Sequence, residues 1–219
     1  MKRILSYLFP IQLKKYNSSI NGQIEVNLFN GKKMLDTSNS NFSYGSLQRI
    51  LRYGIKKIGF NKDTNRILVL GLGGGSIIQT IREEFNSKAY IEAIDIDPKI
   101  IEIAKNDFNI ERFENLKIVQ ADANEYLLTC KTSFDLIIVD IFIIDTIPVI
   151  FTQPEFIDNL KNHLNQKGYI IFNTMKQTMT TDIFRRITNT FAEDSNLTVK
   201  VFNDVEGTNN LIVANKYYH

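Results

Sequence analysis

The feature that most constrains the fold is the run Gly71-Leu-Gly-Gly-Gly-Ser76, which directly follows the apolar segment Ile67–Leu70. A short strand without polar alternation is expected to be buried on both faces. The spacing of apolar residues in Ser76–Phe85 predicts a helix immediately after the glycines. Glycines at a strand-to-helix turn let the backbone approach a ligand, and the helix N-terminus favours an anionic group. The sequence therefore predicts a ligand-binding turn.

Apolar segments and helical patterns alternate along the chain after residue 66. Helices are expected to open at Asp97-Pro98, with Asp97 as the N-cap, and at Thr152-Gln-Pro-Glu155, which has the form of a capping box. Strands separated by helices favour a parallel sheet covered on both faces, which is a doubly wound α/β fold. The expected strands are Ile67–Leu70, Tyr90–Ile96, Leu116–Val119, Leu136–Val139 and Tyr169–Phe172.

The C-terminal segment departs from this alternation. Leu197–Phe202 and Asn210–Ala214 are strand-like, and a short loop containing Asp, Glu and Gly joins them. Such a loop is too short to hold a crossover helix, so the two strands are expected to pair antiparallel. A mostly parallel sheet that ends in an antiparallel hairpin is the Rossmann-like arrangement of class I methyltransferases, and this is the fold class that we predict.

The first 60 residues have a different pattern and predict a small extension. Gln23–Phe29 and Lys32–Asp36 are strand-like and flank Asn30-Gly31, a pair typical of a tight β-hairpin turn. The polar stretch Thr37–Ser43 is expected to be a loop, and Ser46–Ile58 a helix with one apolar face. We therefore divide the chain into a β-hairpin and helix extension, residues 1–60, and a ligand-binding α/β domain, residues 61–219.

Acids at the ends of two predicted strands complete the motif. Asp95 lies 22 residues beyond Gly73 (95 − 73), where a carboxylate can accept hydrogen bonds from ribose hydroxyls. Asp122 ends the third strand, where an acid can accept a hydrogen bond from an adenine amino group. The predicted ligand contacts are Gly71, Gly73, Gly74, Gly75, Asp95, Ile96, Asp122 and Ala123.

Two alternatives stay open for these residues. Nicotinamide dinucleotides use the same turn and acid, but the third glycine of their pattern is Ser76 here, and the antiparallel ending favours a ligand of the S-adenosylmethionine type. The other alternative is purely structural. In it, Gly71–Gly75 is a turn without a ligand, Asp95 is a solvated strand end, and Asp122 is the N-cap of the next helix.

Composition narrows the function classes. The chain has one cysteine, Cys130, and two histidines, so a disulfide framework and a metal site are not expected. A net charge of +2 does not argue for a nucleic-acid partner. No apolar run approaches the ~20 residues of a membrane span, and Met1–Tyr16 lacks the cleavage site of a signal peptide. We expect a cytoplasmic protein, and we leave open a membrane-touching N-terminal segment and a homodimer.

Four successive motifs resemble those of the spermidine synthase family. They are Ile67-Leu-Val-Leu-Gly-Leu-Gly-Gly-Gly75, Ile94-Asp-Ile-Asp-Pro98, Gln120-Ala-Asp122 and, most specific of all, Phe134-Asp-Leu-Ile-Ile-Val-Asp140. The N-terminal hairpin and Tyr44 resemble that family's β extension more loosely, and the similarity covers roughly residues 20–175. It implies that Asp95 holds the ribose, that Asp122 holds the adenine, and that Asp140, also a cofactor contact, activates an amine nucleophile.

Other positions depart from that family. It carries an aspartate where this chain has Gly74, which suits the cationic end of a decarboxylated donor, whereas bare N–H groups suit the carboxylate of intact S-adenosylmethionine. Its second acid after Asp140 is missing here, with Asp145 as a candidate substitute, and its polyamine-gripping acids near Tyr44 are Ser and Asn. The sequence closely resembles an offshoot of spermidine synthase-like proteins, often fused to membrane transporter domains, whose substrates are obscure.

These observations favour a methyltransferase that uses S-adenosylmethionine, intact rather than decarboxylated, and acts on a small amine-type acceptor. Asp140 is expected to orient or deprotonate the amine, and Tyr44 is the second catalytic candidate. Structural roles stay open for both, a loop-organising carboxylate and a packing aromatic. Two other functions also stay open, spermidine synthesis from putrescine and non-catalytic binding of adenosyl nucleosides. The apolar run Ile141–Ile144 favours the latter, and it is expected to raise the pKa of Asp140.

Overall fold

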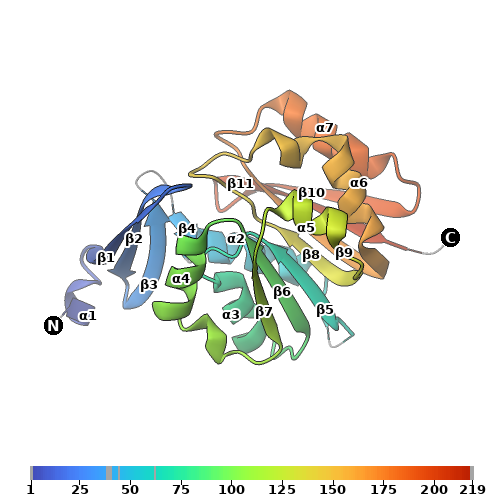
Figure 1. Ribbon diagram of the computed structural model, residues 1–219. Coiled ribbons are helices and arrows are strands. Elements are labelled where there is room, and N and C mark those ends of the chain that lie inside the picture. Colours follow the sequence, from blue (N-terminus) through green and yellow to red (C-terminus); the bar gives the residue numbers. More distant parts are fainter. Residues whose placement is uncertain (1, 38–40, 44, 62, 218–219) are drawn as a thin grey trace.

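The computed structural model describes residues 2–37, 41–43, 45–61 and 63–217. A small and a large β-sheet, with their helices, make up the molecule (Figure 1). The N-terminal elements are α1 (Lys2–Leu5), β1 (Ile11–Ser18), β2 (Gly22–Phe29), β3 (Lys32–Thr37), β4 (Asn41–Ser43) and α2 (Gly45–Lys57). The remaining elements are β5 (Arg66–Leu70), α3 (Ser76–Glu83), β6 (Tyr90–Asp95), α4 (Pro98–Asn106), η1 (Ile110–Arg112), β7 (Leu116–Gln120), α5 (Ala123–Thr129), β8 (Phe134–Val139), η2 (Val149–Thr152), α6 (Pro154–Asn162), β9 (Leu164–Met175), α7 (Thr181–Ala192), β10 (Leu197–Val205) and β11 (Asn209–Lys216).

The large sheet has seven strands in the order β10-β11-β9-β8-β5-β6-β7. β9, β8, β5, β6 and β7 run parallel, and β11 pairs antiparallel with both β9 and β10. The expected class I methyltransferase sheet with its antiparallel ending is confirmed. The chain moves outward from β5 to β7 and then returns to β8 on the other side of β5. This reversal is the place where open α/β sheets bind their ligands.

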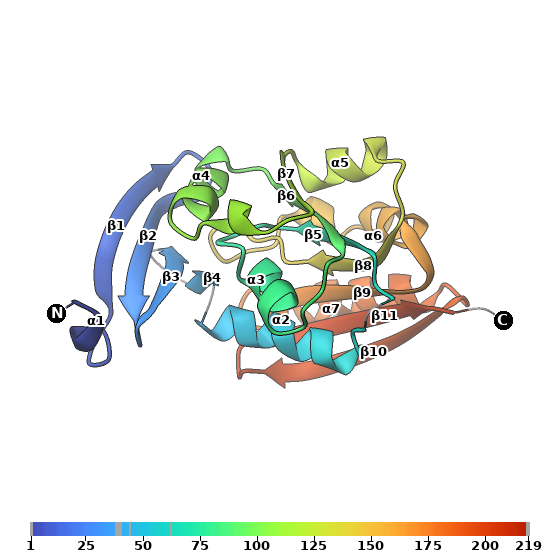
Figure 2. The same cartoon turned by 90° about the horizontal axis from the view of Figure 1, so that it is seen from below.

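Helices cover both faces of this sheet, which explains its apolar central strands. Val69 and Ile138 belong to the core cluster on the side of α2 and α3, whereas Leu68 and Ile137 belong to the cluster under α5, α6 and α7. Figure 2 shows α2 and α3 on one face and α5 on the opposite one. The helix α2 thus packs into the core of the large sheet, and the division of the chain at residue 60 stays a prediction.

The small sheet has four antiparallel strands in the order β1-β2-β3-β4. The predicted hairpin is confirmed as β2 and β3, and Asn30 and Gly31 both have positive φ in its turn. The expected loop over residues 37–43 is partly wrong, because Asn41–Ser43 forms β4 beside β3. The sequence analysis also missed β1. Both missed strands are short or polar, and pairing with a neighbouring strand stabilises them despite weak local preference.

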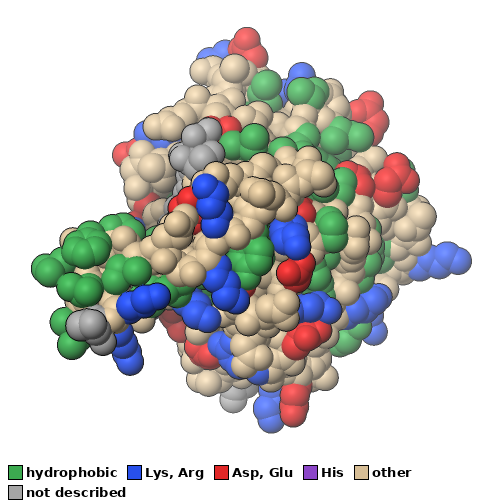
Figure 3. Space-filling view, turned by 60° about the vertical axis from the view of Figure 1, so that its left-hand side comes forward, with side chains coloured by type: hydrophobic (Ala, Val, Ile, Leu, Met, Phe, Trp, Pro, Cys, Tyr) green, Lys and Arg blue, Asp and Glu red, His purple; other side chains and the backbone are tan. Residues whose placement is uncertain are grey.

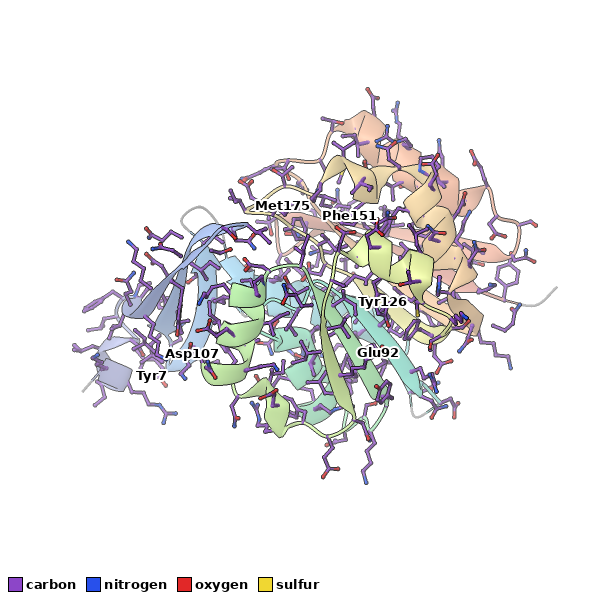
Figure 4. All side chains as sticks on the ribbon, in the orientation of Figure 1. Tyr7, Glu92, Asp107, Tyr126, Phe151 and Met175 are labelled. Carbon is purple, nitrogen blue, oxygen red and sulfur yellow. The ribbon has the colours of Figure 1, made fainter. Side chains whose placement is uncertain are left out.

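The small sheet docks on α4 of the large one. Ile24, Val26 and Leu35 of the small sheet pack against Ile100 and Ile103 of α4. At the end of α4, the buried carboxylate of Asp107 accepts a hydrogen bond from Tyr16 Oη (2.6 Å) and forms an ion pair with Lys14 Nζ (2.6 Å). Figure 4 shows Asp107 between α4 and the strands of the small sheet.

The start of α6 differs from the prediction. Gln153 is the N-cap, without a side-chain hydrogen bond, and Thr152 ends the 3-10 turn η2. The Thr152 hydroxyl donates to the carbonyl oxygen of Val149 (2.8 Å) and accepts from Arg186. The capping-box prediction was therefore wrong, because the preceding turn and α7 use the hydroxyl that the box requires.

Apolar side chains gather on the surface at the N-terminal end of the molecule, on the left in Figure 3. The most exposed are Ile4 (75% exposed) and Leu8 (78%), next to Tyr7 and Phe9. Within the described ranges, none of the helices combines the length and the apolar character that a bilayer crossing requires.

Candidate active site

The turn after β5 requires glycine at two positions for two different reasons. Gly71 has a φ of 96°, and a Cβ there would lie 2.0 Å from the carbonyl oxygen of Asp140. Gly75 has a φ of 78°, and a Cβ there would lie 1.7 Å from Cδ1 of Ile110 in η1. Gly71 therefore permits the close approach of β5 and β8, whereas Gly75 permits the packing of α3 on η1.

Backbone hydrogen bonds hold the carboxyl ends of the central strands together. The Asp140 N–H donates to Leu70 O (2.8 Å), and the Gly71 N–H donates to Ile94 O (2.9 Å). The Ala121 N–H donates to Asp95 O (3.1 Å) on the next strand. The candidate residues that follow β5, β6, β7 and β8 are thereby brought to one edge of the sheet.

Asp95 organises the glycine turn with its side chain. Oδ2 accepts hydrogen bonds from the backbone N–H groups of Leu72 (3.0 Å) and Gly73 (3.3 Å), and Oδ1 accepts from Asp97 N–H (2.9 Å). Burial raises the pKa of Asp95 to about 6, and the three backbone donors oppose that shift. A carboxylate offers about four acceptor positions, so one remains for a ligand hydroxyl.

Asp122 has the capping role that the structural alternative described. Its Oδ1 accepts from the backbone N–H groups of Asn124 (2.8 Å) and Glu125 (3.1 Å) at the start of α5. The same residue also lines the pocket at this edge, as do Ala123 and the 41%-exposed Ile96. Capping therefore does not prevent ligand contact, because the second oxygen, Oδ2, accepts no hydrogen bond from the described residues.

One buried amide holds the side chain of Asp140, and a second buried amide holds the first. Asn173 Nδ2 at the end of β9 donates to Asp140 Oδ1 (2.8 Å), and Asn209 Nδ2 at the start of β11 donates to Asn173 Oδ1 (3.0 Å). Both asparagines are buried. Burial raises the pKa of Asp140 to about 6, and the Asn173 bond opposes the shift, so the expected direction is confirmed.

These residues surround one pocket of about 250 Å³. Glycines and acids form one part of its wall, and apolar side chains from the segment after β8 form another. Phe151 of η2 and Met175 at the end of β9, both labelled in Figure 4, line the pocket. The described residues on the wall are Asn21, Ser46, Leu47, Ile50, Gly71, Gly73, Ile94, Asp95, Ile96, Ala121, Asp122, Ala123, Asp140, Ile141, Phe142, Ile143, Ile144, Phe151, Met175, Gln177, Thr208 and Asn209.

Most of the predicted site residues meet in this pocket. Gly71, Gly73 and the three acids Asp95, Asp122 and Asp140 line it. Gly74 and Gly75 are buried in the turn and are not among the lining residues. Tyr44 lies outside the described residues. Asp145, the candidate second acid, accepts from Thr146 Oγ1 (3.1 Å) and is not among the lining residues either.

The turn between β1 and β2 forms part of the rim. Asn21 lies on the pocket wall, where its Nδ2 donates to the buried Asp97 Oδ2 (2.7 Å) and its Oδ1 accepts from Ile144 N–H (3.2 Å). The hydroxyl of Ser18 also donates to Asp97 Oδ2. Ile144 has a φ of 63°, an unusual value for a β-branched residue. Asp97 thus caps α4, as expected, and also fixes the small sheet beside the pocket.

Sequence reasoning missed the residues that reach the pocket from distant parts of the chain. Asn21 comes from the small sheet, Leu47 and Ile50 from α2, and Asn209 from the C-terminal hairpin. Asn173, which holds Asp140 without being among the lining residues, did have a recognisable signal, since it is a polar residue that directly follows the apolar strand run Tyr169–Phe172. A polar residue at the carboxyl end of a parallel strand is a site candidate.

Comparisons with known proteins show similarity to two kinds of transferase. The chain is 34% identical over 130 residues to a polyamine aminopropyltransferase of Chromobacterium violaceum, which covers 57% of the chain and 49% of that protein. It is 29% identical over 160 residues to an eEF1A lysine and N-terminal methyltransferase of Xenopus laevis, covering 68% of the chain and 21% of that protein. The chain thus spans about half or less of the length of these curated relatives.

Solved structures share the fold. The spermidine synthase from Thermotoga maritima superposes with a TM-score of 0.64 at 17% identity, covering 94% of this chain and 72% of that one. A family model described as "Methyltransferase domain" matches residues 61–212, which is more than half of the chain. The predicted resemblance is therefore confirmed, and the chain belongs to the methyltransferase domain family.

Proposed function

We propose that the chain is an S-adenosylmethionine-dependent transferase that methylates a small amine. The observation that carries this proposal is the position of Asp140 on the wall of the pocket that also contains Gly71, Gly73 and Asp95. A proton acceptor and a nucleoside-binding turn in one pocket are the two parts that such a transfer needs. Membership of the methyltransferase domain family supports the proposal.

The residues present fit the donor. The free acceptor position of Asp95 suits a ribose hydroxyl, and the free oxygen of Asp122 suits an adenine amino group. The exposed side chain of Ile96 and the neighbouring Ala123 offer apolar contact for an adenine ring. The N–H groups at the start of α3, which directly follows the glycine turn, suit the carboxylate of intact S-adenosylmethionine.

Asp140 would receive the proton of the amine. When bound, the sulfonium donor would supply an electrophilic methyl carbon for the amine nitrogen, with the sulfur as the leaving group. Asn173 holds Oδ1 of Asp140, so the other oxygen can meet the amine nitrogen. With a pKa of about 6, the carboxylate is ionised at neutral pH and can orient the amine and take its proton.

A second candidate is aminopropyl transfer from decarboxylated S-adenosylmethionine to a polyamine. The sequence similarity to a polyamine aminopropyltransferase favours it. Two observations argue against it. Gly74 stands where an acid would suit a cationic donor. Asp140 is the one acid on the described part of the pocket wall besides Asp95 and Asp122, which are assigned to the nucleoside, so a polyamine would lack carboxylates for its other charges. Methyl transfer is therefore our leading proposal.

We further propose that the protein acts in the cytoplasm, without a metal ion and without a nucleic-acid partner. One cysteine in 219 residues suits a reducing compartment, and a net charge of +2 does not favour nucleic acid. A homodimer is a sequence-based hypothesis that light scattering on the purified protein would test.

The substitution Asp140→Asn tests the proposal, because it keeps the shape and the hydrogen bond from Asn173 but cannot accept a proton. With S-adenosylmethionine and a panel of amines, we expect at least about a hundredfold loss of turnover. Donor affinity measured by calorimetry should stay within about threefold. Turnover equal to wild type would show that Asp140 only organises its loop. Donor binding without turnover in wild type, with any amine, would instead support a non-catalytic nucleoside-binding domain.

A further inference from the structure

The part of the pocket beyond Asp140 is strongly apolar. Six side chains form it, and we call them the acceptor wall: Ile141, Phe142, Ile143, Ile144, Phe151 and Met175. They come from the segment after β8, from η2 and from the end of β9. The polar residues next to them on the pocket wall, Gln177, Thr208 and Asn209, are uncharged.

Asp140 provides the negative charge beside this wall. Among the described lining residues the other acids are Asp95, which ends β6, and Asp122, which follows β7. They accept hydrogen bonds from backbone N–H groups of the glycine turn and of α5, respectively. Asp145 does not line the pocket and accepts a hydrogen bond from Thr146. One carboxylate at this end of the pocket can pair with one cationic or proton-donating nitrogen.

A second ammonium group would have to lie against the acceptor wall. A cation removed from water needs a charged partner and hydrogen-bond acceptors, or its desolvation opposes binding. An alkyl or aryl group gains from the same contact, because it leaves water for an apolar surface. The wall therefore discriminates between amines of similar length by the number of their charges.

We propose that the acceptor is a monoamine, with one basic nitrogen at Asp140 and an apolar alkyl or aryl body against the acceptor wall. This inference rests on the proposed transferase function and specifies its substrate class. The amide chain from Asn209 through Asn173 orients Asp140 toward the nitrogen. The acceptor loses one N–H proton to the carboxylate as the new C–N bond forms, and the other end of the amine takes no part in the chemistry.

Matched amines of equal chain length test this inference. Calorimetry on the protein saturated with S-adenosylhomocysteine, which cannot react, would compare hexylamine with 1,6-diaminohexane. We expect hexylamine to bind at least tenfold more tightly. Equal or tighter binding of the diamine overturns the inference, and so does the failure of both amines to bind. The proposed function fails separately, if S-adenosylhomocysteine itself does not bind.

Two substitutions place a second acid on the wall. Ile143→Asp and Met175→Glu replace half-buried side chains, and either one should shift the preference at least tenfold toward the diamine. Val149→Asp is the matched control, since Val149 is 67% exposed and is not among the lining residues. Its preference should equal that of wild type. An unchanged preference in both wall variants, when they are folded and bind S-adenosylhomocysteine normally, overturns the inference.

Discussion

Asp95 and Asp140 both have pKa values raised to about 6 by burial, but different groups hold them. Three backbone N–H groups hold Asp95, so its charge is tied to the shape of the glycine turn. One side-chain amide holds Asp140, which leaves more of its carboxylate for a ligand. At the scale of single residues, the first carboxylate is therefore suited to binding and the second to proton transfer.

The free energy of unfolding should depend on pH through the ionisation of the buried Asp140 side chain. Because its folded pKa lies above the unfolded value, ionisation destabilises the fold. The contribution of the protonated Asp140 side chain to the free energy of unfolding is fully present below about pH 4, and it is lost as the pH rises through about 6. Asp140→Asn removes the charge and keeps an acceptor for Asn173. At pH 8 we expect the free energy of unfolding of the variant to be higher than that of wild type by at most about 3 kcal/mol. At pH 4 we expect the two free energies to be equal.

Urea unfolding at the two pH values measures this difference. Asp158→Asn serves as the control, because Asp158 is an exposed aspartate on α6 that pairs with Lys161. Its pH dependence should follow wild type. An Asp140→Asn variant that is less stable than wild type at pH 8 would contradict the assignment of burial as the cause.

Asp95→Ala should weaken the affinity for S-adenosylmethionine at least tenfold. The variant loses a hydrogen bond from the ribose to a charged acceptor, worth about 1.5–3 kcal/mol, and leaves the N–H groups of Leu72 and Gly73 without their acceptor. Calorimetry measures the affinity, and Glu102→Ala, which removes an exposed acid of α4, is the control. Wild-type affinity in a folded Asp95→Ala protein would remove the ribose assignment.

At the scale of elements, the turn between β5 and α3 combines structural and ligand-binding requirements. Gly71 and Gly75 are required by close approach to β8 and η1, so these glycines alone do not identify a ligand. Gly73 and Asp95 both line the pocket, and the Gly73 N–H donates a hydrogen bond to the Asp95 carboxylate. Gly74 is buried, and it is not one of the glycines with positive φ. A side chain at position 74 therefore meets no conformational penalty from φ.

The turn should select the donor through its charge. We expect wild type to bind intact S-adenosylmethionine more tightly than the decarboxylated form, because N–H groups at the start of α3 favour a carboxylate. Gly74→Asp should narrow or reverse this preference in competition calorimetry. Leu128→Asp adds the same charge at an exposed position of α5 that is not among the lining residues, and it should leave the donor preference unchanged. A wild-type preference of tenfold or more for the decarboxylated donor would make aminopropyl transfer the leading function.

At the scale of the whole molecule, the small sheet completes the pocket of the large one. The N-cap Asp97 accepts from Lys99 N–H within α4, and from Ser18 Oγ and Asn21 Nδ2 of the small sheet. Asn21 in turn accepts from Ile144 N–H beside the acceptor wall. One buried carboxylate thus links the helix, the extension and the segment after β8.

Asp97→Ala should therefore cost more than the loss of a helix cap. An N-cap contributes about 1 kcal/mol, and hydrogen bonds to a charged acceptor add about 1.5–3 kcal/mol. We expect a loss of about 2–4 kcal/mol in urea unfolding. Asp122→Ala is the matched control, since Asp122 also caps a helix but accepts only from Asn124 and Glu125 of α5 among the described residues. Equal losses in both variants would show that docking does not depend on Asp97.

The sequence by itself determined the order of strands and helices in the large sheet, its antiparallel ending and the positions of the acids Asp95, Asp122 and Asp140. The three acids are encoded locally, each at the end of a strand of five or six residues or shortly after it. Local patterns identify the central strands because both faces of these strands are buried, so that their positions are occupied almost entirely by apolar residues.

Only the tertiary structure decided which other residues meet those acids. Asn21, Ile50 and Asn209 belong to three elements or turns far apart in the chain, and nothing in their local sequence indicates that they line one pocket. The strands β1 and β4 and the true cap of α6 were likewise decided by partners elsewhere in the fold. The physical reason is that a hydrogen bond or a packing contact depends on proximity in space, which a one-dimensional pattern does not contain.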